Sequence, residues 1–307
     1  MVKKYMSGEQ LIKIAFISAS GGAGKTKLSL GLAWYLFRRK YRILLMDLDP
    51  TAGLSLLVLN ENAYLRTIES NKTLSGLLAD EQKGINKSLD EYTINISLGK
   101  RDEIISLPFN LLIPGEDLIT QITQLFSGMY RNPGERFSKI ITKRIPKGKW
   151  SFIIIDSAPF FDPRYIALSI SLADWLIIPL RPTLIDFVRT YRMLKILEDD
   201  ISTERILCLF NLVPTNPRIP ERKLVENVKK GALYDYSSRD QRLSRRYETL
   251  REWYERLSSD FNLMVIPEFI DNAIDIDRFP TKGTESNFKA KTEKTYENLL
   301  DIILGKQ

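Results

Sequence analysis

Short apolar stretches recur along the chain, and most of them are rich in β-branched residues and bounded by turn-forming residues. Each is followed by a segment in which apolar residues repeat at helical spacing. This alternation is typical of parallel strands that are buried on both faces and connected by helices. The predicted strands are Leu11 to Ser18, Arg42 to Asp47, Asn110 to Ile113, Ser151 to Asp156, Trp175 to Leu180, Arg205 to Asn211 and Leu263 to Ile266.

The segments between the strands predict helices, so we expect an α/β fold with a doubly wound, mostly parallel sheet and helices on both faces. No internal repeat, low-complexity tract or Pro/Gly-rich linker divides the chain, which favours a single domain over residues 1–307. The predicted helices are Thr26 to Arg39, Thr73 to Leu78, Leu118 to Phe126, Arg164 to Leu172, Leu184 to Glu198, Glu221 to Lys230, Asp240 to Leu257 and Glu285 to Leu304.

Two segments fit this alternation poorly and are predicted to be excursions from the sheet. From about Asn60 to Glu103 the chain is polar, with only short scattered patterns. From about 233 to 259 it is highly charged and rich in helix-forming residues, with one apolar stripe at helical spacing, so we interpret it as a charged helical insertion. We expect the stripe to pack on the rest of the domain.

The composition is that of a globular protein that can bury a sizeable core. Of its 307 residues 44% are hydrophobic and 27% are charged, which excludes a disordered or fibrous chain. No run approaches the roughly 18 apolar residues that a membrane helix requires. The apolar run Ile14 to Ile17 is too short for a signal peptide and follows Lys13. We therefore expect a soluble, cytoplasmic protein.

The side-chain inventory limits the available chemistry. Cys208 is the only cysteine and the chain has no histidine, so an internal disulfide, a cysteine-held metal cluster and a histidine base are all excluded. Chemistry must use carboxylates, lysines and backbone amides. The formal net charge of +7 favours a polyanionic partner without identifying it.

A glycine-rich loop directly follows the first predicted strand and precedes an amphipathic helix. Its sequence is Ser-Ala-Ser-Gly-Gly-Ala-Gly-Lys-Thr, residues 18–26. Glycines allow backbone N–H groups to turn inward around phosphate oxygens, and the helix N-terminus adds partial positive charge. Lys25 would reach the β- and γ-phosphates, and the Thr26 hydroxyl would ligate Mg²⁺. The sequence therefore predicts a nucleotide site.

The loop resembles the deviant Walker A motif of the ParA/MinD family of ATPases, and more closely that of ParA-type DNA-partition ATPases. Ala19 stands where the standard P-loop has its first glycine, whereas the Gly-Gly pair and the Ala-Gly-Lys-Thr ending match. The family usually has a signature lysine before the Gly-Gly pair, which reaches the partner's phosphates in a sandwich dimer. This chain has Ser20 there. The nucleotide-binding residues predicted on the loop are Gly21, Gly22, Ala23, Gly24, Lys25, Thr26 and Lys27.

Two aspartates end the second predicted strand, where open α/β sheets bind their ligands. The segment Asp47-Leu48-Asp49-Pro50-Thr51 resembles the family's Asp-x-Asp-Pro-Gln switch segment, with threonine in place of glutamine. The resemblance implies that Asp47 holds a water molecule of the Mg²⁺ shell. It also implies that Asp49 orients the water that attacks the γ-phosphate, and positioning of this kind is most of what a protein contributes to phosphoryl transfer.

The strand Phe152 to Asp156 has the form of a Walker B strand, with apolar residues leading to Asp156 and Pro159 beyond it. A buried carboxylate is costly unless a cation lies near it, so we assign Asp156 to Mg²⁺ through water. Further along the chain, the segments that end at Asn211 and Pro267 resemble the two strand ends that frame adenine in the family. The Asn211 amide can both donate to and accept from the adenine edge.

Members of the family differ in what their nucleotide-dependent dimer binds. The final residues, 296–307, are apolar but carry little basic charge, which disfavours a MinD-like membrane helix. A lone cysteine disfavours a metal-cluster carrier. Positive residues on two predicted helices and ahead of one of them favour DNA; the candidate DNA-binding residues are Arg189, Arg192, Arg218, Arg222 and Lys223.

Taken with the resemblance, these features predict a ParA-like DNA-segregation ATPase. ATP and Mg²⁺ would drive a homodimer that binds DNA non-specifically, and slow hydrolysis, stimulated by a centromere-binding partner protein, would reset it. Such a protein would be cytoplasmic and associated with the nucleoid. Two alternatives stay open: a nucleotide-binding structural or DNA-binding module with little hydrolysis, since Ser20 replaces the signature lysine, and a MinD-like membrane-positioning ATPase.

Overall fold

The computed structural model describes residues 11–100, 103–128, 132–160, 162–234, 236, 240–271 and 290–306, with only the backbone of residues 97–100 and 103–108. Its contacts form two compact units, and neither unit is a continuous stretch of chain. Among the described residues, the first unit comprises 11–17 and 26–174. The second comprises 18–25, 175–271 and 290–306.

The first unit has five strands in the order β3-β4-β2-β5-β1. All neighbouring strands are parallel except β3 and β4, which pair antiparallel. Every residue of β2 and β5 is buried, as expected for strands covered on both faces. The strands are β1 (Ile12–Phe16), β2 (Ile43–Asp47), β3 (Ile94–Lys100), β4 (Glu103–Leu112) and β5 (Phe152–Asp156).

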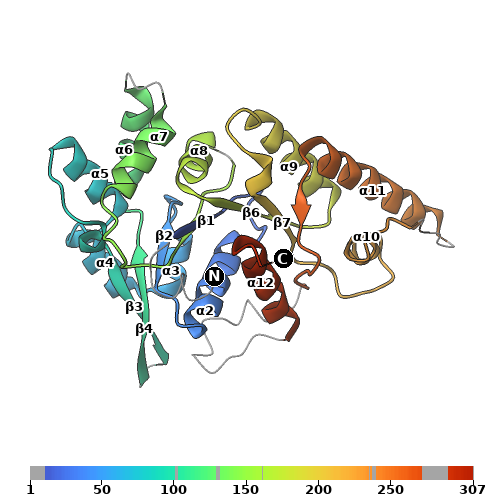
Figure 1. The fold of residues 1–307 in the computed structure, drawn as a ribbon, viewed down its shortest axis with the longest axis horizontal. Helices are drawn as coiled ribbons and strands as arrows, with labels where there is room; N and C mark the ends of the chain where they lie inside the picture. The colour runs from blue at the N-terminus through green and yellow to red at the C-terminus, as the bar shows by residue number, and fades with distance from the viewer. Residues whose placement is uncertain are drawn as a thin grey trace. The chain divides into compact units, whose positions relative to one another are not determined.

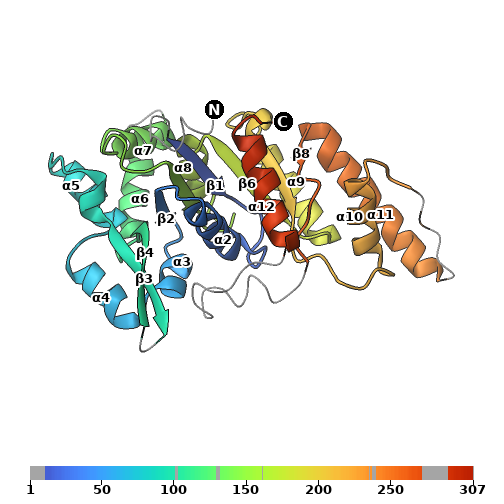
Figure 2. The same cartoon turned by 60° about the horizontal axis from the view of Figure 1, so that its bottom comes forward.

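Helices cover both faces of this five-stranded part of the sheet. α2 and α3 lie on one face, and α6, α7 and α8 lie on the other (Figures 1 and 2). Their starts follow ordinary capping chemistry: the Asn132 side chain accepts from the N–H of Glu135 just after Pro133 opens α7. The helices are α2 (Lys25–Arg38), α3 (Gly53–Val58), α4 (Glu61–Glu69), α5 (Leu74–Gln82), α6 (Leu118–Ser127), α7 (Pro133–Thr142) and α8 (Pro163–Leu172), with a 3₁₀ turn at Leu89–Tyr92.

The register of this unit brings three strand ends to one edge. Phe16, the last residue of β1, is paired with Asp156 of β5, and Asp47 of β2 is paired with the same Asp156. The Ser157 hydroxyl donates to the Phe16 carbonyl at 2.8 Å and fixes the end of β1. The chain therefore leaves β1 for the glycine-rich loop at the same edge that carries Asp47 and Asp156.

The second unit contains β6 (Trp175–Leu180), β7 (Ile206–Phe210) and the two-residue β8 (Met264–Val265), all parallel. α9 and α11 lie on one side of these strands and α12 on the other (Figure 1). The Thr183 side chain caps α9 by accepting from the N–H of Asp186. The helices are α9 (Leu184–Ile196), α10 (Pro220–Lys229), α11 (Gln241–Phe261) and α12 (Ala290–Ile303), with a 3₁₀ turn at Thr203–Arg205.

The predicted α/β fold class, with its doubly wound and mostly parallel sheet, is confirmed. All seven predicted strands and the eight predicted helices have counterparts, although β4 begins earlier than the predicted strand Asn110 to Ile113. The predicted helix Glu285 to Leu304 begins at Ala290 within the described part, and residues 285–289 lie outside it. In the charged segment, residues 235 and 237–239 also lie outside, and α11 buries the predicted stripe with Tyr247, Leu250, Tyr254 and Leu257.

The interpretation of residues 60–103 as a polar excursion missed regular structure. α4 occupies Glu61–Glu69, and β3 pairs with β4 as an antiparallel hairpin. α3 and α7 were not predicted either. The apolar residues of β3 are interrupted by Asn95, Ser97 and Gly99, because the strand is at the outer position of its unit and has one neighbour only. Single-domain organisation and the status of 233–259 as an insertion stay predictions.

Candidate functional site

The glycine-rich segment Ser18–Lys25, called here the phosphate loop, belongs to the second unit and joins β1 to α2. Gly22 and Gly24 adopt φ values of 75° and 92°, a region that L side chains rarely enter. Gly24 is under a second constraint, because a Cβ at this position would lie 2.3 Å from the Asn211 Nδ2. Gly21 and Gly22 are exposed, so their backbone is accessible to a ligand.

Lys25, predicted to reach phosphates, lies back over the loop. Its side chain is buried, and Nζ donates to the Ser18 Oγ at 2.9 Å. That hydroxyl in turn donates to the Ser20 carbonyl at 2.7 Å. These hydrogen bonds place the Lys25 ammonium next to the turning backbone of the loop. An anion bound there would interact both with this positive charge and with the backbone N–H groups.

Asn211 braces the loop from the end of β7. It is buried, and its Nδ2 donates to the Ala23 carbonyl at 2.8 Å. This contact was not foreseen, because the sequence analysis assigned the same amide to adenine. The adenine role of Asn211 stays a prediction, as does that of Pro267, which is exposed just beyond β8. β7 and β8 are parallel, so both residues follow strand ends at one edge.

Two arginines, Arg181 just after β6 and Arg189 on α9, approach the phosphate loop. Arg189 of α9 brings Nη1 to 3.4 Å from the Ser20 Oγ. Arg181, just after β6, has its Nη1 4.0 Å from the position that a Cβ on Gly22 would take. Arg181 is paired with the buried carboxylate of Asp186, to which its Nη2 donates at 3.0 Å and its Nε also donates. The pKa of Arg181 is raised by this hydrogen bonding.

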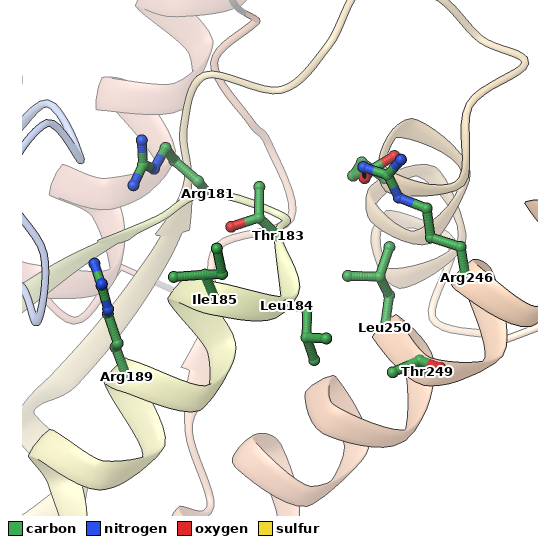
Figure 3. Close-up of a pocket in the computed structure, with 9 residues that line it drawn as sticks. Arg181, Thr183, Leu184, Ile185, Arg189, Arg246, Thr249 and Leu250 are labelled. Carbon is green, nitrogen blue, oxygen red and sulfur yellow. Dashed lines mark ion pairs between the residues drawn. The ribbon is translucent and has the colours of Figure 1, made fainter.

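A cavity of about 670 Å³ adjoins these arginines within the second unit. Arg181 and Arg189 lie on one side of it and Arg246 of α11 on the other (Figure 3), and Arg246 is paired with the buried Glu221. Two apolar residues of α9, Leu184 and Ile185, are exposed on its wall. The remaining lining residues are Thr183, Thr249 and Leu250.

The first unit contains the three predicted acidic residues Asp47, Asp49 and Asp156, called here the carboxylate cluster. Asp47 and Asp156 are fully buried register partners. Asp47 accepts from the Ser55 Oγ at 2.7 Å, from the Ser55 N–H at 2.9 Å and from the Asp49 N–H at 3.1 Å. Burial outweighs these hydrogen bonds and raises the pKa of Asp47 to about 7.

The other predicted residues near this edge are less enclosed. Asp49 is half-buried, and its carboxylate accepts from the N–H of Thr51 at 2.9 Å and from the Thr51 Oγ1 at 2.7 Å. Thr51, which stands in place of the family's glutamine, therefore orients Asp49. Thr26 and Lys27 are half-buried in the first turn of α2, where the Thr26 carbonyl accepts from the Ser29 hydroxyl at 3.0 Å.

The donor set fits magnesium. Among the described residues there is no group of three or more His, Cys, Asp or Glu side chains able to hold a metal ion by themselves. The available donors are carboxylate and hydroxyl oxygens, which Mg²⁺ prefers, and a Mg²⁺ site normally uses one or two carboxylates together with water and substrate phosphates. Two buried carboxylates on neighbouring strands are also best kept ionised by a cation.

The candidate DNA-binding residues do not share one environment. Arg192 and Arg218 are exposed and Lys223 is half-buried. Arg222 is ion-paired with Glu226 and with Asp271, so its charge is largely compensated within the chain. Arg189 is the candidate that contacts the phosphate loop. DNA binding by the five residues stays a prediction.

The described helices include none that is both long enough and apolar enough to span a membrane. The apolar face of α12 is buried. Its buried residues are Thr292, Thr295, Tyr296, Leu299, Leu300 and Ile303.

Comparison with protein families matches residues 12–199 to a family described as an AAA domain. Among individual proteins, the chain is 26% identical over 220 residues to an uncharacterized protein of Methanocaldococcus jannaschii, covering 70% of this chain and 78% of that protein. It is 33% identical over 81 residues to a protein of Thermus thermophilus assigned as a plasmid-partitioning protein ParA. That match covers 26% of this chain and 24% of the relative.

Solved structures with the same fold include a protein of Borrelia burgdorferi B31 assigned as a plasmid partition protein and bound to AMPPNP. It has a TM-score of 0.64 and 16% identity and covers 97% of this chain and 100% of its own. Cobyrinic acid a,c-diamide synthase of Mycobacterium smegmatis, solved with an ATP analogue and magnesium, has a TM-score of 0.61 and 16% identity over 97% of each chain. At these identities the likeness establishes the P-loop NTPase type of fold.

Proposed function

This chain belongs to the matched AAA-domain family, of ParA/MinD type, and on that premise we propose that it is a DNA-partition ATPase. In this proposal the chain binds ATP with Mg²⁺, forms an ATP-dependent homodimer and holds DNA non-specifically. Slow hydrolysis then resets it. A plasmid-partitioning protein among its relatives and a plasmid partition protein among structures of the same fold support this choice.

One observation carries the nucleotide part of the proposal. The phosphate loop follows β1, whose last residue Phe16 is paired with Asp156, and the loop holds the buried ammonium of Lys25 over its own backbone. A cation, exposed glycine amides and a helix N-terminus in one short segment form a site for a polyphosphate.

Each predicted residue then has a task in the reaction. Lys25 binds the β- and γ-phosphate oxygens, and the amides of Gly21 to Gly24 enclose them. Asp49, oriented by Thr51, positions the attacking water molecule. Magnesium, when bound, neutralises charge that develops between the phosphates. Thr26 would hold it directly, and Asp47 and Asp156 would hold it through water.

The DNA-binding part of the proposal rests on the positive charge of the chain and on its similarity to plasmid-partition proteins. The chain carries a net charge of +7, and two of the exposed candidates, Arg192 and Arg218, have no ion pair among the described residues. Cations of this kind bind phosphates without reading sequence. The proposal includes a partner protein bound at a centromere-like DNA site that accelerates hydrolysis, and it places the chain in the cytoplasm at the nucleoid.

The decisive experiment measures phosphate release and DNA retention on the same preparation. Wild-type protein should hydrolyse ATP faster than an Asp49→Ala variant, and it should retain random-sequence DNA with ATP and Mg²⁺ better than with ADP. Each phosphate contact should contribute about 0.9 to the slope of log affinity against log salt. Equal and weak DNA retention in both nucleotide states would exclude a DNA switch.

The first alternative, a nucleotide-binding module with little hydrolysis, is favoured by Ser20 at the position of the signature lysine. It predicts ATP binding with a turnover no faster than that of Asp49→Ala. A membrane-positioning ATPase has weaker support, because the apolar face of α12 is buried. Flotation with anionic liposomes and ATP tests it directly, since that alternative requires co-flotation.

A further inference from the structure

Arg189 stands out because it is a long cationic side chain directed at the phosphate loop from a distant part of the chain. Its Nη1 lies 3.4 Å from the Ser20 Oγ, a contact between residues 169 positions apart. A hydrogen bond at this distance is weak. A guanidinium has five N–H donors, so the contact leaves most of its capacity unused.

The neighbouring Arg181 differs from Arg189 in how its charge is balanced. Two of its nitrogens donate to the Asp186 carboxylate, which is buried at the start of α9. Arg189 has no ion pair among the residues that the structure describes. Its side chain is exposed and borders the 670 Å³ cavity, so it can move without breaking a salt bridge.

The position of Arg189 fits a phosphate better than it fits the serine. Ser20 immediately precedes Gly21 and Gly22, which are exposed and therefore accessible to a phosphate. A guanidinium binds phosphate through two parallel N–H···O bonds, which are shorter and stronger than a bond to a neutral hydroxyl. Figure 3 shows Arg189 and Arg181 on the same side of the cavity, opposite Arg246.

We propose that Arg189 binds the terminal phosphates of the nucleotide held by the phosphate loop of its own chain, leaving Ser20 when the nucleotide arrives. Arg181, fixed by Asp186, serves as the stationary neighbour, with its Nη1 beside Gly22. The inference rests on the proposed function, because it presumes a nucleoside triphosphate on the loop. It assigns Arg189 to nucleotide recognition instead of to DNA.

The first test compares nucleotide affinities by calorimetry with Mg²⁺ present. Arg189→Ala should weaken ATP binding by about 10- to 100-fold, the effect of losing a charge-assisted pair of hydrogen bonds. AMP, which lacks the terminal phosphates, should bind equally to both proteins. Arg189→Lys should fall between them. Lys195→Ala is the matched control, because Lys195 is an exposed cation on the same helix that pairs with Glu198.

The second test separates phosphate binding from support of the loop. Ser20→Ala removes the partner of Arg189 in this structure, and ATP affinity should remain within about twofold of wild type, because the guanidinium is free to move to the phosphate. Ser20→Lys combined with Arg189→Ala places an ammonium beside the same glycines and should restore most of the lost affinity. A loss in Ser20→Ala as large as that in Arg189→Ala would overturn the proposal.

The outcomes distinguish this inference from the proposed function. If wild-type protein fails to bind ATP, the proposed function falls and this inference falls with it. If wild type binds ATP and Arg189→Ala binds it equally well, only the inference is overturned. A variant that keeps ATP affinity but loses DNA retention would return Arg189 to the DNA-binding residues and would likewise overturn the assignment made here.

Discussion

The carboxylate cluster of the first unit and the phosphate loop of the second differ in where the side chains that hold them lie along the chain. Asp47 and Asp49 are held by groups close to them in the chain, since Asp47 bonds to Ser55 and Asp49 bonds to Thr51. The loop has local bonds from Lys25 to Ser18 and from Ser18 to Ser20, but it is also braced from far along the chain by Asn211, which donates to Ala23 across 188 residues. Arg189 makes a weaker contact with Ser20 across 169 residues.

This difference determines how each region responds to substitution. Asp47 of the carboxylate cluster is buried and accepts three hydrogen bonds, so a change there removes a charge that no neighbouring group replaces. The phosphate loop functions through its backbone, whose path depends on a strand end and a helix elsewhere in the sequence. Local substitutions should therefore harm the first region, whereas substitutions that alter distant contacts should harm the second.

Asp47→Asn should have the largest effect and tests the first region most directly. The amide keeps the shape of the side chain but cannot carry the negative charge, so we expect phosphate release to fall by about 10²- to 10³-fold. Circular dichroism should show a folded protein. Glu69→Gln, at an exposed carboxylate, is the control. Turnover within threefold of wild type would show that the cluster does not act through the charge of Asp47.

Gly24→Ala tests the dependence of the loop on a distant residue. Its Cβ would be 2.3 Å from the Asn211 Nδ2, at a φ of 92°, so we expect ATP affinity to fall at least about tenfold. Gly84→Ala is the matched control: it has a φ of 71° but nothing within 4 Å of its Cβ, so it carries backbone strain without a clash. Equal ATP affinities in the two variants would show that the clash with Asn211 does not cause the loss.

Ser55→Ala sharpens the comparison within the carboxylate cluster. It deletes the 2.7 Å hydrogen bond to Asp47 in a fully buried site, and the expected loss of unfolding free energy is about 1–3 kcal/mol. Thr51→Ala deletes an equally short bond to Asp49 at an exposed position and should lose no more than about 0.5 kcal/mol. Urea denaturation measures both, and similar losses would contradict the role given to burial.

Cys208 lies on β7, the strand that leads to Asn211. The ionisation of its thiol should have the smallest effect of these changes. Burial raises the pKa of its thiol to about 12, so the group stays protonated at pH 9, where an exposed thiol is largely ionised. Because the pKa is raised, the associated stability is present below pH 9 and is lost as pH rises toward 12. Ellman's reagent at pH 9 should label denatured protein fully and folded protein only slowly; rapid labelling would show that β7 opens readily.

Features that depend on neighbours in sequence were predictable. The glycine loop, the two strand-end aspartates and the buried strands were all predicted from residues within about ten positions of each other. The start of α7 also carried a local signal, Asn132 followed by Pro133 and Glu135, but no helix was predicted there. α4 had a similar signal in Asn60, whose side chain accepts from the Ala63 N–H.

Features that depend on distant pairing were not predictable. The strand β3 is an exception, because apolar and polar residues alternate from Ile94 to Lys100, and this local strand signal was overlooked when the segment was interpreted as a polar excursion. The contacts of Asn211 with Ala23 and of Arg189 with Ser20 require the fold to bring separate segments together. Sequence patterns selected both residues but assigned them to adenine and to DNA, since side-chain chemistry alone suits several ligands.

The outermost strands have a consequence for the behaviour of the protein at high concentration. β8 is two residues long, and the pairing of β3 shifts register between Asn95 and Ser97. Short or irregular edge strands are poor templates for pairing with a strand of another molecule. Such edges protect a sheet against aggregation. We therefore expect copies of this protein to resist strand-to-strand polymerisation when they are concentrated in one place.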